Sequence, residues 1–291
     1  MRKINMSWQS VLLSVALLGL AACTGDFEDI NRNPNQVTEE QMDALNYKTG
    51  TKFKSLQSLV IPVQEHMYQF NESLSGGPFG GYIGATVDTW QTKFETYNPS
   101  ADWRKWPFAN VITETYTPYK GIVNGTEDEV AIAFARLLRV AIMHRVTDSY
   151  GPIPYSKMQN GTFSVPYDSQ RDVYMAMIDD LDAAMETLYT FASAGDGILM
   201  RDFDISSFKG DSRLWVSFAN TLKLRMAIRM SGVEPEARRI AEEAVRDMAT
   251  YGLIDANAEN LSFSSDSRQN PFYTQATSTS WQDLRSNADG I

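Results

Sequence analysis

The side chains best suited to binding a ligand gather in one aromatic segment, residues 73–116. After the run GGPFGG, it carries three tryptophans and a tyrosine within seventeen residues, 90–106. A sugar ring stacks its apolar C–H face on an aromatic plane, and its hydroxyl groups need amide or carboxylate partners. We therefore expect a ligand site in which Trp90, Tyr97 and Trp103 stack and Asp88, Asn98 and Asp102 supply polar contacts.

The same aromatic side chains are equally able to fill a core beneath the loop, and this alternative stays open for each tryptophan of the segment. Trp106 is followed directly by Pro107 and Phe108, which favours a more buried position. Trp215 lies on the apolar stripe of a predicted helix, so we expect it in the core.

The only cysteine of the chain, Cys23, follows a short cationic start and the apolar run 11–20. That layout is typical of a secretory signal peptide, and the run is too short for a membrane span of about twenty residues. Residues 20–23, Leu-Ala-Ala-Cys, resemble the lipobox of bacterial lipoproteins, in which the cysteine is lipidated. We predict a signal peptide at 1–22 and a lipid anchor on Cys23; an ordinary signal peptide with an unmodified cysteine is the alternative.

A tether and one folded domain should follow the anchor. Residues 23–37 combine acids, three asparagines and a proline, a composition that suits an extended tether. Thr38 begins TEEQ, a capping-box pattern, so we place the domain at 38–291. A net charge of −10 argues against nucleic acid as a partner, because phosphates would be repelled.

Apolar periodicity predicts amphipathic helices that pack as antiparallel hairpins, which favours an all-α fold. We expect Arg136 and Arg139 on a different face of their helix from the apolar residues, and a solvated face for Asp179, Asp180, Asp182 and Glu186. After Tyr251 we expect loop with one short strand. The four clear helical stretches are 127–148, 167–189, 212–230 and 234–252.

No catalytic residue, metal site or cofactor is predicted. Glycoside hydrolysis needs two carboxylates across a cleft, and 36 acids make any one pair uninformative. The chain has two histidines, and His144, near a helix end, suits a favourable charge or a satisfied polar group there. Asp196, Asp202 and Asp204 lack the spacing of a hand-type calcium loop.

Four segments, in this order, resemble the SusD/RagB family of nutrient-binding outer-membrane lipoproteins. The resemblance extends from residue 20 to about residue 286. Its segments are the lipobox with DFEDINRNPNQVT, the corner TDSYGPIPYS, YDSQRDVYMAMIDDLDAAMETL, and FKGDSRLWVSFANTLKLRMAIRM.

The resemblance implies tetratricopeptide-like helix hairpins with long aromatic-rich loops, held by lipid at the outer membrane and facing the cell exterior. It implies a binding protein, not an enzyme, that captures oligosaccharides or peptides over a TonB-dependent, SusC-like transporter. Asp26, Glu28 and Asp29 resemble the surface-export signals of such lipoproteins. Family members usually run longer, so we expect the C-terminal part of the fold to be missing and one helical face to be incompletely covered.

Two other functions remain open. A lipid-anchored glycosidase would turn over an oligosaccharide and lose that activity on replacement of one acid. A helical-repeat lipoprotein that binds only protein would have no glycan affinity. The aromatic segment favours glycan binding over the second of these.

Overall fold

The structure is a computed structural model that describes residues 46–86, 90–158, 164–263, 270–276 and 281–286. All of them belong to the unit Asn46–Ile291. The predicted signal peptide, Cys23, the tether and the capping box at Thr38 lie outside the described residues, as does Asp88. No described helix is long and apolar enough to span a membrane.

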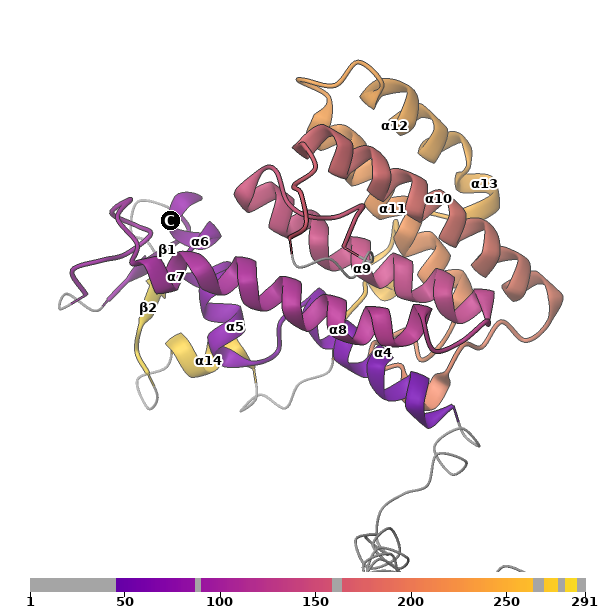
Figure 1. The fold of residues 1–291 in the computed structure, drawn as a ribbon, viewed down its shortest axis with the longest axis horizontal. Coiled ribbons are helices and arrows are strands. Elements are labelled where there is room, and N and C mark those ends of the chain that lie inside the picture. Colours follow the sequence, from indigo (N-terminus) through magenta and orange to yellow (C-terminus); the bar gives the residue numbers. More distant parts are fainter. Residues whose placement is uncertain (1–45, 87–89, 159–163, 264–269, 277–280, 287–291) are drawn as a thin grey trace, which may run out of the picture. The chain divides into compact units, whose positions relative to one another are not determined.

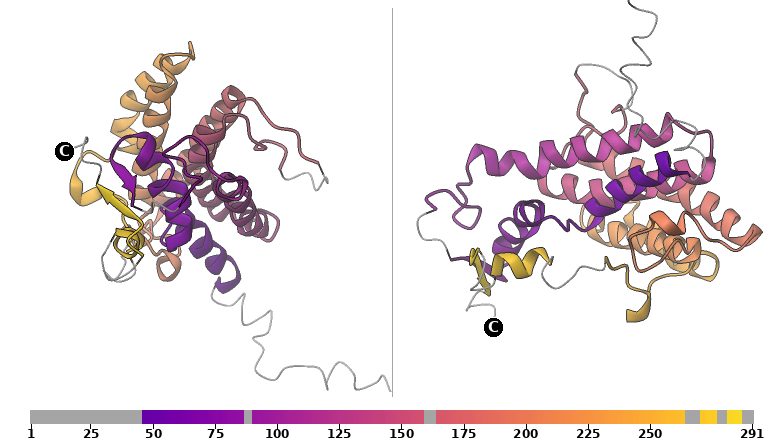
Figure 2. Two further views of the ribbon diagram at one scale, coloured as in Figure 1. Left: turned by 90° about the vertical axis from the view of Figure 1, so that its left-hand side faces the viewer. Right: turned by 90° about the horizontal axis from the view of Figure 1, so that it is seen from below.

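Long helices form the body of this unit, and each packs against the next along the chain (Figures 1 and 2). We call α4 and α8 to α13 the helical body. This chain-order packing matches the predicted all-α architecture. The helices are α4 (Tyr47–Val60), α8 (Val111–Val123), α9 (Glu129–Tyr150), α10 (Gln170–Ala194), α11 (Ser212–Met230), α12 (Ala237–Arg246) and α13 (Met248–Tyr251).

Polar residues at the helix ends explain where the long helices begin. The side chains of Asp128, Ser169 and Asp211 each accept a hydrogen bond from a backbone N–H in the first turn of α9, α10 and α11. These bonds satisfy N–H groups that have no partner within the helix. Helix α9 ends at Gly151, whose φ of 73° suits glycine. Capping thus fixes the starts of the three longest helices.

Helix α9 is buried on nearly all its sides, so Arg139, which we expected on a face other than the apolar one, is itself buried. Its guanidinium carbon lies 4.5 Å and 4.3 Å from the ring centroids of Tyr119 and Tyr155. Arg139 also forms a 2.5 Å ion pair with Asp180, which accepts a 2.6 Å hydrogen bond from the Tyr155 hydroxyl. Asp180 is therefore an inward-facing partner and not part of a solvated face. The cause is that α9 packs against α4, α8 and α10 together.

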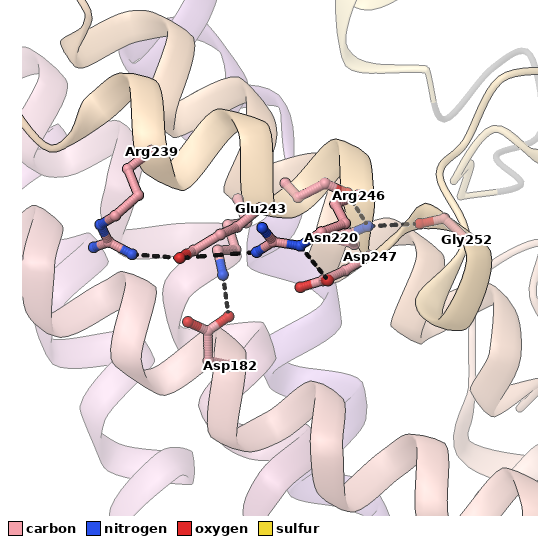
Figure 3. A network of polar contacts seen from close by, with 9 residues as sticks. Asp182, Asn220, Arg239, Glu243, Arg246, Asp247 and Gly252 are labelled. Atoms are coloured by element: carbon pink, nitrogen blue, oxygen red, sulfur yellow. Dashed lines mark hydrogen bonds and ion pairs between the residues drawn. The ribbon is translucent and has the colours of Figure 1, made fainter.

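Polar contacts also tie α10, α11 and α12 together, as Figure 3 shows. The buried ammonium of Lys223 donates a 2.6 Å hydrogen bond to Asp182, so Asp182 is only partly solvated. Asn220 donates to the carbonyl oxygens of Ala244 and Gly252 at 3.0 Å and 2.8 Å. These contacts hold the short helix α13 and the end of α12 against α11.

A small lobe lies at one end of α8 and α9, at the left in Figure 1. It has its own core of Leu74, Phe94 and Leu284. Strands β1 and β2 pair antiparallel with Ala85 opposite Leu284. The lobe consists of α5 (Glu65–Tyr68), η1 (Gln69–Ser73), α6 (Gly76–Phe79), β1 (Ile83–Ala85), α7 (Ala101–Lys105), η2 (Trp106–Asn110), α14 (Pro271–Ala276) and β2 (Leu284–Ser286).

The C-terminal segment therefore completes this lobe. The single short strand predicted after Tyr251 is confirmed as β2, but helix α14 and the turn η4 (Asn257–Glu259) were not predicted. A further turn, η3 (Arg201–Phe203), packs on α4. Gln275 of α14 is buried and donates a 2.8 Å hydrogen bond to the Glu65 carbonyl. This bond fastens α14 to α5.

The helical body keeps several apolar side chains on its surface. Among the described residues of α11 to α13 and their connections, these are Ile228, Val233, Val245 and Met248.

Candidate ligand-binding site

The small lobe presents a stacked pair of exposed aromatic rings, Phe79 and Tyr97. Their centroids lie 5.2 Å apart with an interplanar angle of 26°. Tyr97 is 80% exposed and Phe79 51%, and the nearby Tyr82 is 75% exposed. Large aromatic side chains usually bury most of their surface, so an exposed stacked pair is a candidate contact surface.

Local backbone geometry positions the two rings. The run GGPFGG forms α6, which ends with Phe79, and Gly81 follows with a φ of 74°. Tyr97 itself has a φ of 58°, an unusual value for a residue with a Cβ. The Asn98 side chain closes this loop because its amide donates a 3.2 Å hydrogen bond to the Gln91 carbonyl. Asn98 thus supports Tyr97, and its role as a ligand partner stays a prediction.

The predicted tryptophans lie beside the lobe's own core. Trp90 and Trp103 meet edge to face, with centroids 5.2 Å apart, and both are partly buried against that core. Trp106 stacks on Phe70 at 5.7 Å and is also partly buried, packed against the core of the helical body. The structure therefore brings Trp90 and Trp103 together beneath the loop, and their contact with a ligand stays a prediction.

The predicted carboxylates are less closely connected with the rings. Asp102 is exposed in the first turn of α7, where a negative charge suits the helix N-terminus. Asp88 lies outside the described residues. Among the three aromatic side chains predicted to contact the ligand, that of Tyr97 is the most exposed to solvent.

A cleft of about 480 Å³ separates this part of the lobe from the end of α9. We call it the first cleft. Phe79 and Phe94 line it from the lobe, and Arg145, Ser149 and Tyr150 line it from α9. Its volume lies within the range of about 300–1,000 Å³ that is common for small-molecule sites. The exposed Phe79–Tyr97 pair is therefore continuous with the first cleft.

The polar groups of this cleft keep defined charges. Burial lowers the pKa of Arg145 to about 10, so this side chain stays cationic at neutral pH. Arg145 pairs with Glu72 and donates a 2.8 Å hydrogen bond to the Val60 carbonyl. Burial raises the pKa of Tyr150 to about 12, and its neutral hydroxyl donates to the Arg104 carbonyl at 2.6 Å. The α9 side of the cleft is therefore organised before any ligand arrives.

Sequence reasoning missed the contribution of α9 to this cleft. The segment TDSYGPIPYS was noted only as a corner; its first four residues form the last turn of α9, and the fold places Ser149 and Tyr150 opposite the aromatic segment. Phe79 was also missed, although it stands within the singled-out run GGPFGG.

A metal site is not apparent in the described part of the chain, where no group of three potential ligands gathers. Asp204, one of the three aspartates considered for calcium, is buried and already occupied. It accepts hydrogen bonds from the backbone N–H of Ser206 and Gly210 and from the Trp215 indole at 2.8, 2.7 and 2.9 Å. Its carboxylate therefore has a structural task.

Comparison with known families explains this arrangement of helices and lobe. A model of SusD-like proteins, described as Susd and RagB outer membrane lipoprotein, matches residues 29–291. The chain belongs to the SusD-like family. The resemblance noted in the sequence is thereby confirmed, and the family description makes its members outer-membrane lipoproteins.

Solved structures of SusD homologues share the fold. One from Bacteroides thetaiotaomicron is 42% identical with a TM-score of 0.73, covering 84% of this chain and 49% of its own. One from Bacteroides ovatus is 34% identical with a TM-score of 0.74, covering 84% and 48%. A chitin-binding SusD homologue from Flavobacterium johnsoniae is 30% identical with a TM-score of 0.73, covering 83% and 50%.

This SusD-like chain thus spans about half the length of the solved chains that it matches. A comparison with curated proteins finds no match. This chain and the matched half of each solved chain share the same fold. That fold includes the helical body that positions the first cleft.

Proposed function

We propose that this SusD-like chain is a cell-surface lipoprotein that binds oligosaccharides and delivers them to a TonB-dependent, SusC-like transporter. Peptides are the alternative nutrient. The exposed Phe79–Tyr97 stack beside the first cleft carries the proposal, because such a surface matches the apolar face of a sugar ring. The chitin-binding relative from Flavobacterium johnsoniae supports a glycan as the ligand class.

Binding requires no chemical step in this proposal. A sugar ring stacks on the exposed ring of Tyr97, and its hydroxyl groups reach the polar lining of the first cleft. Arg104 offers donors there, and the Ser149 hydroxyl, which donates its proton to the Arg145 carbonyl at 2.9 Å, offers an acceptor. Affinity should be modest, since captured ligand must be handed on to the transporter.

The anchor belongs to the same proposal. Lipid on Cys23 would hold the protein at the outer membrane, and a tether at 23–37 would let the body move relative to the transporter. Placement on the outside of the cell is tested by protease treatment of intact cells. Complete protection of the protein would contradict that placement.

A glycan-array screen tests the ligand class. The probe is the full chain with Cys23→Ala, which prevents lipidation, with and without Tyr97→Ala. The matched control is Tyr47→Ala, since Tyr47 is also an exposed tyrosine but lies on α4. We expect saturable binding to one glycan class that Tyr97→Ala weakens and Tyr47→Ala does not.

Other outcomes would overturn the proposal in distinct ways. No glycan binding by a folded chain would favour a peptide ligand or a lipoprotein that binds only protein. Release of shorter sugars from the array glycan would favour the glycosidase.

A further inference from the structure

A second cleft, of about 490 Å³, lies in the helical body where α9 ends, α10 begins and α11 ends. Its polar lining comes from α9, α10, α11 and the connection after α11. These polar residues are Asp148, Gln170, Arg171, Tyr174, Arg229 and Glu234. None of them was singled out as a ligand residue by the sequence, and the lobe contributes nothing to this cleft.

The charges of the second cleft balance one another. Arg229 forms a 2.9 Å ion pair with Asp148, and Arg171 forms a 2.7 Å ion pair with Glu234. Two cations facing two anions give no net attraction for a charged ligand. Arg171 and Arg229 are both largely exposed, so the tips of their guanidinium groups are accessible to a ligand.

Hydrogen-bond partners hold this lining in place. The Tyr174 hydroxyl donates to Asp148, and burial with this hydrogen bond raises the pKa of Tyr174 well above its usual value. Gln170 donates a 2.8 Å hydrogen bond from its amide nitrogen to the Thr147 carbonyl. The amide oxygen of Gln170 and the exposed guanidinium groups then supply an acceptor and several donors side by side.

Asp148 lines both clefts, which therefore adjoin at the end of α9. Its side chain is fixed from the second cleft by Arg229 and Tyr174, while its neighbours Ser149 and Tyr150 line the first cleft. The two clefts have similar volumes, about 480 and 490 Å³. A chain-like ligand could occupy both.

We propose that the second cleft is a further subsite for an extended, uncharged oligosaccharide whose first units occupy the first cleft. This inference rests on the proposed glycan-binding function. Balanced charge disfavours ionic ligands, and clustered donors and acceptors suit the neighbouring hydroxyl groups of a sugar. Met230 and Val233 add apolar surface to the same cleft. Affinity should then increase with the number of sugar units.

A length series of neutral oligosaccharides tests this subsite. The probes are malto-, cello-, xylo- and chito-oligosaccharides from two to six units, titrated calorimetrically into the full chain with Cys23→Ala. For the class that binds, we expect the hexamer to bind about tenfold more tightly than the dimer. One additional hydrogen bond to a charged group can supply such a factor.

Two variants alter the second cleft in different ways, one by removing donors and the other by filling its space. Arg229→Gln removes guanidinium donors, and Val233→Arg fills the hollow from an exposed position. Each should reduce the tenfold length dependence to less than about threefold and leave dimer affinity unchanged. Arg225→Gln is the matched control, because Arg225 is exposed one turn earlier on α11 and does not line the cleft.

The outcomes separate the subsite from the proposed function. Glycan binding whose length dependence survives both variants would overturn the subsite and leave the first cleft as the whole site. Equal affinity for dimer and hexamer would also overturn it. Absence of binding to every probe and to the array would overturn the glycan function and the subsite together.

Discussion

The small lobe and the helical body use aromatic side chains in opposite ways. In the body, Trp215 is fully buried among Phe134, Phe208 and Phe218, and its indole N–H donates to Asp204. In the lobe, Tyr97 stacks on a ring that is itself half exposed. Burial with a hydrogen-bond partner stabilises the fold, whereas exposed stacking leaves surface available to a ligand. The same residue types are therefore buried for stability in the body and, in the function that we propose, exposed for recognition at the Phe79–Tyr97 stack of the lobe.

Replacing Trp215 tests the body's side of this comparison and should have the largest effect. Trp215→Ala removes a fully buried ring and leaves Asp204 without its indole donor. We expect a loss of about 3–5 kcal/mol in the free energy of unfolding, measured by urea denaturation. Trp90→Ala, at a partly buried lobe position, should cost less than half as much. Equal losses of stability in the two variants would contradict the different roles of aromatic side chains in the body and in the lobe.

Arg139 gives the second largest effect. Arg139→Met leaves Asp180 without its cation inside the body, and we expect a loss of about 3 kcal/mol in the free energy of unfolding. The control is Arg136→Met on the same helix, where Arg136 is partly exposed and a change within about 0.5 kcal/mol is expected. Similar losses in both variants would show that Arg139 contributes only as an ordinary surface arginine.

Variants of Tyr97 and Trp103 test which aromatic side chains of the lobe contact the ligand and which stabilise its core. Tyr97→Ala should weaken glycan affinity about tenfold and change the free energy of unfolding by less than about 0.5 kcal/mol. Trp103→Ala should lower stability by about 1–2 kcal/mol, because its ring packs beside Phe94 and Trp90. Calorimetric binding and thermal unfolding of both variants measure this difference. Unchanged affinity in Trp103→Ala would assign this ring to the core alone.

The smallest expected effect is the pH dependence of the stability of the helical body. His144 is buried, its Nδ1 lies 3.0 Å from the Val140 carbonyl, and burial lowers its pKa. Nearby Asp148 acts to raise this pKa and Arg225 to lower it. The unfolded chain then binds the proton more readily, so stability should fall as pH decreases below about 6.5.

His144→Gln removes this titration. The difference in slope between wild type and variant, followed by urea denaturation between pH 7.5 and about 5, isolates the contribution of His144. Identical slopes would mean that His144 takes up its proton equally in the folded and unfolded chain. A wild-type stability that instead rises relative to the variant as pH decreases would favour the alternative of a favourably charged histidine at the helix end.

The sequence predicted most of the helical body because its signals are local. Apolar periodicity located α9 to α12, and the side chain of Ser169 caps α10. Helix α14 escaped because it is only six residues long and has too few turns for a stripe. The burial of Arg139 was not predicted, and Asp180 was wrongly expected on a solvated face, because periodicity describes one helix, whereas burial depends on which neighbours surround α9.

The candidate site was only partly predictable for the same reason. The aromatic segment was recognised from composition, and Tyr97 is exposed as a stacking residue should be. Phe79 became a candidate only through its contact with Tyr97, and the α9 wall of the first cleft required the fold. Both depend on contacts between segments far apart in the chain.

Hydrogen exchange with and without the glycan identified on the array is the most direct test of whether that glycan binds at the aromatic stack. It reports which amides a bound ligand protects. We expect protection in the lobe around 76–98 and at the end of α9, residues 145–150, with the outer face of α12 unchanged. Protection confined to the helical body away from both clefts, or none at saturating ligand, would contradict binding at the aromatic stack.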